Sequence, residues 1–407
     1  MLRIIRILKK PKHLLILILF FTTLLRVTRL DFPNKFVFDE VYHAFTAQEF
    51  LKGNIEAWEW WTTPPPGVAY EWTHPPLAKE IMAVSMLLLN SQEGWAWRLP
   101  GTALGIFSVY LVYLLGKKLL KSEVASLIAA FAFSIDGLNF VQSRIGMNDI
   151  YYITFMLLSL YFFLNKKFLL SAIMLGLSLS SKWAALYTYI IYMPLLMQRR
   201  LFKQLIILII IPTLIYFLTY GPFFILGHNF NQFIDLHKQM WWYHTNLKAA
   251  HDYASPAWSW PFNLYPVWYF VDYQNNLIAN IFSSGNPILL WLGFVSILLT
   301  LWETIRKKSV NLFILSLGFF AFWLPWLASP RIMFLYHFSA SIPFLCLALG
   351  HQISKEIIYP KDKWKIFLFI IILSLGFALI YPFLIAIHLP KDFMMLFFYT
   401  NLTKNPF

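Results

Sequence analysis

The sequence predicts an all-α polytopic membrane protein of about eleven transmembrane helices. Of 407 residues, 59% are hydrophobic and only 13% are charged, whereas about a quarter of a soluble domain is charged. Apolar runs of roughly 17–22 residues, long enough to cross a bilayer core, recur along the chain. Short clusters of Lys and Arg separate many of these runs, which is the positive-inside pattern. The net charge of +14 therefore indicates membrane topology and not nucleic-acid binding.

The apolar runs and the basic clusters together define the expected spans. The first run follows a basic segment and lacks a small-residue cleavage site, so we interpret it as a retained signal anchor with the N-terminus inside. About eleven crossings then leave the C-terminus outside. The expected spans are 13–31, 98–117, 122–140, 149–165, 168–181, 183–198, 202–220, 287–304, 310–327, 333–351 and 364–388.

One further apolar segment, 77–92, is too short and too polar at its ends to cross comfortably. Counting it as a span would move the next basic cluster to the outside, against the positive-inside pattern. We therefore expect a juxtamembrane or re-entrant helix on the outer face.

Two outer loops, 32–97 and 221–286, are long and rich in Trp, Tyr and Pro, residues that suit the headgroup level. We expect two parts, residues 1–220 with the first outer loop and residues 221–407 with the second outer loop and four further helices. Only four of the nineteen acidic residues fall on the cytoplasmic side of this topology, namely Glu123, Glu303, Glu356 and Asp362. Carboxylates collected on one side indicate where chemistry or cation binding takes place. The single cysteine excludes an intrachain disulfide and a cysteine-based metal site.

The motif most indicative of function is Phe38-Asp39-Glu40-Val41-Tyr42-His43, directly after the first span. Two adjacent carboxylates at a membrane surface repel each other, and a low-dielectric setting raises the pKa of at least one. Such a group suits a general base toward a hydroxyl. The structural alternative is that Asp39 and Glu40 cap the next helix.

A second motif, Thr73-His74-Pro75-Pro76-Leu77-Ala78-Lys79, ends an extended segment and starts a helix, because Pro is favoured in a first helical turn. This places His74 at a helix N-terminus, where free backbone N–H groups favour an anion. The alternative is that the motif only begins a re-entrant helix.

Four polar residues lie at outer ends of spans. Arg144 and Asp149 belong to a tight turn, Gln142-Ser143-Arg144-Ile145-Gly146-Met147-Asn148-Asp149, and Lys182 occupies a similar turn. Arg98 stands at the mouth of a span. The functional interpretation is an anion site; the alternatives are that Arg144 and Asp149 pair with each other and that Arg98 only snorkels.

The last motif is Pro330-Arg331-Ile332-Met333-Phe334-Leu335-Tyr336-His337. On a helix, Arg331 and His337 fall on neighbouring sides, so both are able to reach one phosphate. A structural ion pair is the alternative.

In this order and spacing, the motifs resemble those of protein O-mannosyltransferases. The matching segments are FDEVYHAF, THPPLAKE, WAWRLPG, QSRIGMND, LSSKWAALY, YHTNLKAAHDYASPAWSWPFN and PRIMFLYHFSASIPF. The resemblance spans about residues 35–345, and the block from Tyr243 to Trp268 is distinctive of that family.

The resemblance implies a GT-C glycosyltransferase fold with its catalytic module in residues 1–220. It implies an inverting enzyme that moves mannose from a polyprenyl-phosphate-mannose donor to Ser or Thr hydroxyls of secreted or membrane proteins. Asp39 and Glu40 match the acidic pair of the family, and Asp39 is the expected base. The expected donor-phosphate and substrate residues are His74, Arg98, Arg144, Asp149, Lys182, Arg331 and His337.

The sequence departs from eukaryotic members in one respect, because loop 221–286 is too short for their soluble β-trefoil domain. The chain therefore resembles the reduced prokaryotic form, which implies a multi-pass protein of the cytoplasmic membrane with its active site on the outer face. An acidic pair is also able to bind Mg²⁺ or Mn²⁺, but the resemblance requires no metal. The sequence leaves open whether the chain dimerises.

Two other functions stay open. A GT-C transferase that moves another sugar, such as aminoarabinose, onto a lipid or cell-wall glycan shares the acidic first loop and a Pro-Pro-Leu segment. A transporter is more distant, since it calls for charges at mid-membrane and repeated halves, whereas here the charges gather at one surface.

Overall fold

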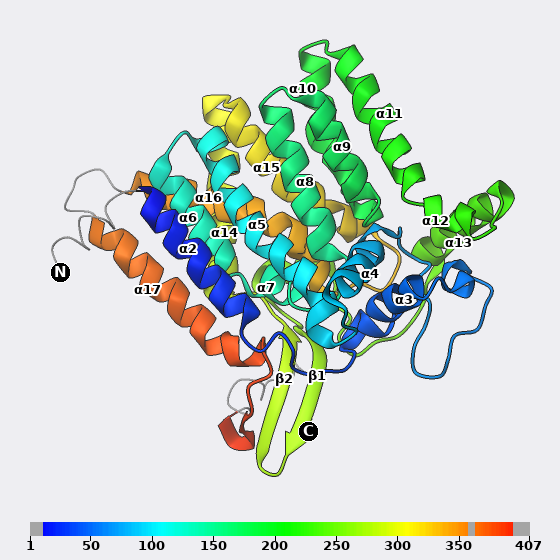
Figure 1. Ribbon diagram of the computed structural model, residues 1–407. Coiled ribbons are helices and arrows are strands. Elements are labelled where there is room, and N and C mark those ends of the chain that lie inside the picture. The colour runs from blue at the N-terminus through cyan, green and yellow to red at the C-terminus, as the bar shows by residue number, and fades with distance from the viewer. Residues whose placement is uncertain (1–10, 357–362, 394–407) are drawn as a thin grey trace.

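The computed structural model describes residues 11–356 and 363–393. The basic segment ahead of the first span, Asp362 and the C-terminal end therefore lie outside the described residues. Within the described residues the chain forms a bundle of helices, and a small β-sheet projects from one end of it (Figure 1). The mostly helical class predicted from the sequence is confirmed.

A helix lies in each of the expected spans, although several bounds differ. In order these helices are α2 (Pro11–Val27), α5 (Gly94–Leu120), α6 (Glu123–Ser134), α8 (Asp149–Leu164), α9 (Phe168–Leu179), α10 (Thr188–Gln198), α11 (Phe202–Leu218), α14 (Pro287–Lys307), α15 (Val310–Trp323), α16 (Ile342–Lys355) and α17 (Lys363–Ile380). The range 122–140 holds two helices, because Asp136 caps a second one, α7 (Gly137–Gln142), by accepting from the N–H groups of Leu138 and Asn139. The ranges 183–198 and 333–351 begin with 3-10 segments, η3 (Trp183–Tyr187) and η6 (Leu335–Ser341).

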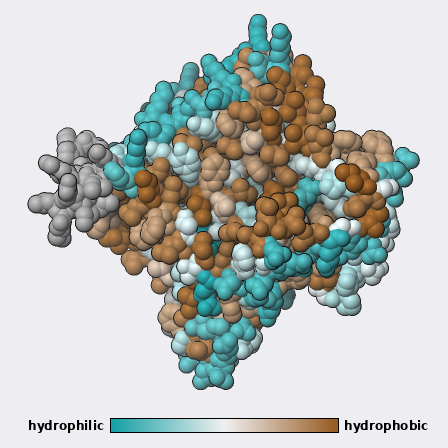
Figure 2. All heavy atoms as spheres, viewed as in Figure 1, coloured by the Kyte–Doolittle hydropathy of each residue, from teal (hydrophilic) through white to brown (hydrophobic). Residues whose placement is uncertain are grey.

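The helical body is that of an integral multi-pass membrane protein. Four stretches are long and apolar enough to cross a membrane, namely Gly94–Leu120, Pro287–Lys307, Val310–Ala328 and Trp364–Phe383. Four shorter apolar helices, α6, α8, α9 and α11, lie beside them. Figure 2 shows hydrophobic side chains over the helical body and hydrophilic ones toward its upper edge and over the projecting hairpin. The number of crossings stays a prediction.

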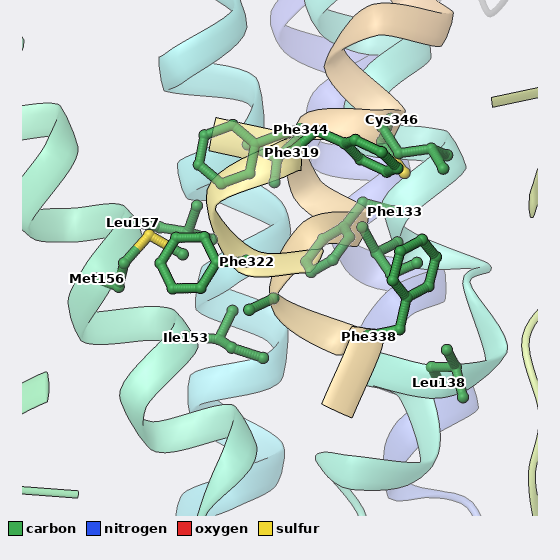
Figure 3. Packing of buried hydrophobic residues seen from close by; sticks show 14 of the residues in the cluster. Phe133, Leu138, Ile153, Met156, Leu157, Phe319, Phe322, Phe338, Phe344 and Cys346 are labelled. Atoms are coloured by element: carbon green, nitrogen blue, oxygen red, sulfur yellow. The ribbon is translucent and has the colours of Figure 1, made fainter. Parts of the chain in front are cut away.

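Large apolar side chains fill the centre of the bundle. Phe133 of α6, Phe322 of α15 and Phe344 of α16 belong to one buried cluster that also includes residues of α8 (Figure 3). Helices α6 and α16 approach so closely that a Cβ at Gly350 would lie 2.3 Å from the carbonyl oxygen of Ala125. Only glycine allows this contact, which lets α16 pack directly on α6.

The outer loops form short elements at the lower end of the bundle in Figure 1. The first outer loop holds η1 (Phe38–Val41), α3 (His43–Leu51), η2 (Ile55–Trp58) and α4 (Leu77–Leu89). Helix α4 falls in the predicted segment 77–92 and packs against α3 and α5 through Ala78, Met82 and Met86. The second outer loop holds α12 (Gly221–Ile225), α13 (Phe230–Asn246), η4 (Ala257–Phe262) and two strands.

The strands were not predicted. Strands β1 (Val267–Gln274) and β2 (Leu277–Ser283) form an antiparallel hairpin, and β3 (Leu389–Pro390) pairs with β2. The register shifts between Trp268 and Phe270, so the bulged residue Tyr269 turns toward η1. Two β-prone runs joined by Asn275-Asn276 carried the hairpin signal in the sequence.

Candidate active site

Asp39 lies in η1, in the first outer loop after α2. The preceding residue, Phe38, has a left-handed backbone with φ of 51°, which is unusual for a bulky side chain. Its ring stacks on Tyr269 of β1, with 4.1 Å between ring centroids, and lies near Tyr336 of η6. Aromatic contacts from distant parts of the chain therefore stabilise the turn, in which Asp39 is less buried than Glu40.

The surroundings of Asp39 suit a proton acceptor. Its pKa is raised to about 7, first by burial and then by the negative charge of Glu71; Lys182 opposes the rise, and Asp149 adds to it. A carboxyl whose pKa lies near neutrality is half deprotonated there and is basic enough to take a proton from a hydroxyl.

Glu40, the second member of the acidic pair, is fully buried and has its acceptors occupied. Its carboxylate accepts hydrogen bonds from Arg98 Nε at 2.8 Å, Arg98 Nη2 at 2.7 Å and Trp97 Nε1 at 2.9 Å. The backbone N–H groups of Val37 and Gly146 donate to it as well, at 2.9 and 2.8 Å. Glu40 therefore stabilises the loop, and its carboxylate is already bound within the protein, unlike the catalytic group expected from the sequence.

Arg98 likewise has a structural role, whereas the sequence placed it in an anion site. It is only 2% exposed, and besides Glu40 it donates to the carbonyl oxygens of Leu30, Pro33 and Lys35. The ion pair thus anchors the segment that leads from α2 into η1. Because Glu40 is occupied in this way, the acidic pair does not offer two carboxylates to one cation, and no three His, Cys, Asp or Glu side chains of the described residues are arranged to hold a metal.

Lys182 and Asp149 form a buried ion pair between the turn after α9 and the start of α8. The Lys182 ammonium lies 2.9 and 3.0 Å from the two carboxylate oxygens, and it also approaches the rings of Tyr152 and Tyr336. An ammonium has three donors, so one is left for a further acceptor. The pair keeps a positive charge close to Asp39.

Arg331 reaches the site through a histidine that sequence reasoning missed. Its Nη1 lies 2.5 Å from Nδ1 of His244, the residue near the end of α13. The His244 ring stacks on His74 at 5.0 Å, and His74 stacks in turn on His43 at 6.0 Å. His74 therefore lies inside a row of three imidazoles that leads from Arg331 toward η1.

Glu71 is the second functional candidate that sequence reasoning missed. Its carboxylate accepts a short hydrogen bond from Thr73 Oγ1 and lies 3.9 Å from His43 Nδ1. Lys79 Nζ donates to the carbonyl oxygens of Glu71 and His74. In the sequence, its position three residues before the His74-Pro75-Pro76 segment could have indicated that it lies near the site.

The burial of His43 and His74 lowers the pKa of both well below the usual range, with added effects of nearby cations. Both rings are therefore neutral near pH 7. His74 Nδ1 is buried without a hydrogen-bond partner among the described residues. The His74 ring therefore offers a neutral hydrogen-bonding nitrogen, and not a positive charge, to this part of the site.

Arg144 lies away from this centre, which is a second correction. Its guanidinium donates to carbonyl oxygens at the end of α2, those of Leu25, Arg26 and Arg29. The last carbonyls of a helix lack intrahelical partners and carry partial negative charge, so Arg144 caps α2. It pairs neither with Asp149 nor with the other predicted phosphate residues.

His337 is buried in η6 among aromatic rings. It lies 4.5 Å from the ring of Trp326 and 4.6 Å from that of Tyr336, and its Nδ1 meets the backbone of Phe334. Residues before Leu335 are irregular, so Arg331 and His337 do not lie on one helix. The charges of Lys182 and Arg331 still act on His337, so the three residues share one neighbourhood.

The structure thus brings together Asp39, His74, Asp149, Lys182, Arg331 and His337. The side chains of Glu40, Arg98 and Arg144 bind other partners.

Comparisons with known proteins agree with this arrangement of helices. A family model described as dolichyl-phosphate-mannose-protein mannosyltransferase matches residues 16–226. A second, described as the C-terminal four-TMM region of protein-O-mannosyltransferase, matches residues 229–392.

Individual proteins show the same likeness. A polyprenol-phosphate-mannose–protein mannosyltransferase of Mycolicibacterium smegmatis is 22% identical over 373 residues, covering 71% of this chain and 72% of the relative. The fold is similar to the S. cerevisiae protein O-mannosyltransferase Pmt1-Pmt2 complex bound to the sugar donor, with a TM-score of 0.77, 16% identity and coverage of 93% of this chain and 90% of that one. It is also similar to ArnT from Cupriavidus metallidurans bound to undecaprenyl phosphate, with a TM-score of 0.62, 15% identity and coverage of 88% and 63%.

Proposed function

Because this chain belongs to the dolichyl-phosphate-mannose-protein mannosyltransferase family, we propose that it transfers mannose from a polyprenyl-phosphate-mannose donor to Ser and Thr hydroxyls of translocated proteins. It is a membrane glycosyltransferase of the GT-C class. The names of the mycobacterial relatives, which specify a polyprenol-phosphate-mannose donor and a protein acceptor, support this choice of substrates.

One observation carries the proposal. The carboxyl of Asp39 has a pKa near neutrality and feels the charge of Lys182, and the charges of Arg331 and Lys182 both act on one common neighbour, His337. A base on one side and two cations on the other suit a displacement in which a hydroxyl loses a proton while a phosphate leaves.

In the proposed reaction, the acceptor oxygen attacks the anomeric carbon of mannose as Asp39 takes the hydroxyl proton. The bond between that carbon and the phosphate oxygen breaks, and the electron pair stays on polyprenyl phosphate, so the configuration is inverted in a single step. Lys182 and Arg331 stabilise the negative charge that grows on the phosphate. A phosphate is a good leaving group, so the step needs one base and no general acid.

We place this reaction on the outer face of a prokaryotic cytoplasmic membrane. The turn between α10 and α11 carries Arg199 and Arg200, and the first turn of α11 carries Lys203. That turn lies at the end of the bundle opposite the β1–β2 hairpin (Figure 1). Basic turns are typically cytoplasmic, so the site end faces outward, where translocated polypeptides and the sugar-bearing lipid meet.

The direct test uses the purified chain in proteoliposomes with radiolabelled polyprenyl-phosphate-mannose and a Ser/Thr-rich peptide. We expect label in the peptide, on Ser or Thr, with inverted configuration. Parallel reactions contain polyprenyl-phosphate aminoarabinose with lipid or glycan acceptors. Transfer only in the parallel reactions, or no transfer at all, would refute the proposal.

The pH profile of transfer is a second expected result. The base must be deprotonated to act, so kcat/KM is expected to rise about tenfold per unit at low pH and to level off above about pH 7, the pKa of Asp39. Steady-state rates between about pH 5 and 9 measure this midpoint.

The variant Glu71→Gln provides the control, because the Glu71 charge is the second cause of the raised pKa of Asp39. Its removal should shift the midpoint of the profile to lower pH. A midpoint near the ordinary pKa of an aspartate in the unsubstituted protein would contradict the assignment.

A further inference from the structure

His244 holds two hydrogen bonds that join separate parts of the candidate site. Its Nε2 lies 2.7 Å from the carbonyl oxygen of Thr73, and its Nδ1 lies 2.5 Å from Nη1 of Arg331. A carbonyl only accepts and a guanidinium only donates. These partners therefore assign one tautomer, in which Nε2–H donates to Thr73 and the lone pair of Nδ1 accepts from Arg331.

The charge state of His244 agrees with this tautomer. Burial and the Arg331 cation lower the pKa of His244 to about 4, although the bond to Thr73 opposes the shift. The imidazole is therefore neutral at working pH and keeps the lone pair that Arg331 needs.

The His244 ring is itself held in place from two sides. It stacks on His74 at 5.0 Å and lies 5.9 Å from the ring of Trp183. The Thr73 bond fixes its rotation. A rigid ring of this kind is able to position a flexible partner.

Arg331 needs such a partner, because it lies between η5 (Leu324–Ala328) and η6 in a segment without regular structure. Its other side-chain hydrogen bond among the described residues is a weak one, from Nε to the carbonyl oxygen of the next residue, Ile332, at 3.3 Å. Among the described residues, no carboxylate lies within ion-pair distance of Arg331. The guanidinium thus keeps donors available for an anion, but without His244 it would sample many rotamers.

We propose that His244 is a positioning residue that aims Arg331 at the phosphate of the lipid-linked donor and ties Arg331 to the loop of Thr73 and His74. The inference rests on the proposed function, in which Arg331 binds that phosphate. It adds that the second outer loop contributes to donor binding through a residue that does not touch the donor. Pre-organisation of this kind lowers the entropy lost on binding.

The experiment measures donor KM and kcat separately in proteoliposomes. His244→Ala is expected to raise the donor KM about tenfold, the effect of one hydrogen bond to a charged group, with a smaller change in acceptor KM. His244→Asn retains an acceptor near the position of Nδ1 and should restore most of the donor affinity. His244→Gln retains a donor toward Thr73 and should restore less.

His237 supplies a matched control on the same helix. It also lies near Trp183, at 6.2 Å, but its Nε2 bonds to the hydroxyl of Tyr216 and not to Arg331. His237→Ala should leave the donor KM unchanged. If it raises the donor KM as much as His244→Ala does, the effect is one of helix packing and the inference is wrong.

A double-mutant cycle with Arg331→Ala decides between positioning and general damage. If His244 acts through Arg331, His244→Ala should change the donor KM less than about twofold in the Arg331→Ala background. An unchanged tenfold effect there overturns the role of His244 and leaves Arg331 in place. A normal donor KM for Arg331→Ala alone would overturn both, since it removes Arg331 from the phosphate.

Discussion

Replacement of Asp39 by Asn is expected to reduce mannosyl transfer at least about a hundredfold while the protein still inserts and folds. Asn has nearly the same shape as Asp but does not accept a proton at neutral pH, so the acceptor hydroxyl would attack without a base. Asp39 is less buried than Glu40, and among the described residues its carboxyl makes no hydrogen bond that the change would remove, so the stability of the fold should change little. Initial rates of peptide mannosylation at saturating donor measure the effect.

Asp31 provides the control for this variant. It is an exposed aspartate at the start of the same outer loop, and Asp31→Asn should leave transfer unchanged. Thermal unfolding in detergent would show that both variants are folded. If Asp39→Asn retains full activity, Asp39 is not the base, and Glu71 becomes the carboxylate to examine.

Composition and basic clusters were sufficient to predict the helical membrane fold, because the bilayer imposes length and apolarity on every span. They were not sufficient to locate helix breaks. The break at Asp136 depends on a capping hydrogen bond inside an apolar run, and the late start of α16 depends on the aromatic packing of η6. The hairpin in loop 221–286 was missed since its first strand, β1, is rich in aromatic residues, like the membrane-surface segments around it.

The acidic pair shows what the sequence could and could not provide for the site. Its two members are equal in the sequence, but a 3-10 turn sends Glu40 into the protein and leaves Asp39 less buried. Which carboxylate meets an arginine depends on a residue 58 positions away. Charge alone likewise grouped Arg144 with Lys182, although the Arg144 guanidinium donates to carbonyl oxygens at and just after the end of α2.

His244 and Glu71 were missed for the same reason. His244 matters because it bonds to Arg331, which is 87 positions away in the sequence. Glu71 matters because its charge acts on Asp39, and no sequence motif indicates either relation. Both lay inside or beside segments that carried the family resemblance, so the resemblance located the region and the structure selected the residues.

Substitution of Arg98 by Met is expected to have the largest effect on stability, a loss of about 3–5 kcal/mol, because it leaves the buried charge of Glu40 without its partner. Arg98 is 2% exposed and Glu40 is fully buried, so water does not compensate. The same change removes the bonds to the carbonyls of Leu30, Pro33 and Lys35. The segment that leads to Asp39 would then be free to move, and we expect transfer to fall together with thermal stability in detergent.

Two further variants separate the ion pair from other effects of the change. In Arg98→Met combined with Glu40→Gln, the amide oxygen still accepts from Trp97 and Gly146, but its NH₂ group faces the N–H of Val37, so only part of the stability should return. Lys117→Met breaks the partly exposed pair with Glu123 and should cost less than about 1 kcal/mol. If Arg98→Met were as mild as Lys117→Met, the Glu40 carboxylate would be free to leave its site. The assignment of Asp39 as the base and of Glu40 as a structural residue would then have no structural basis.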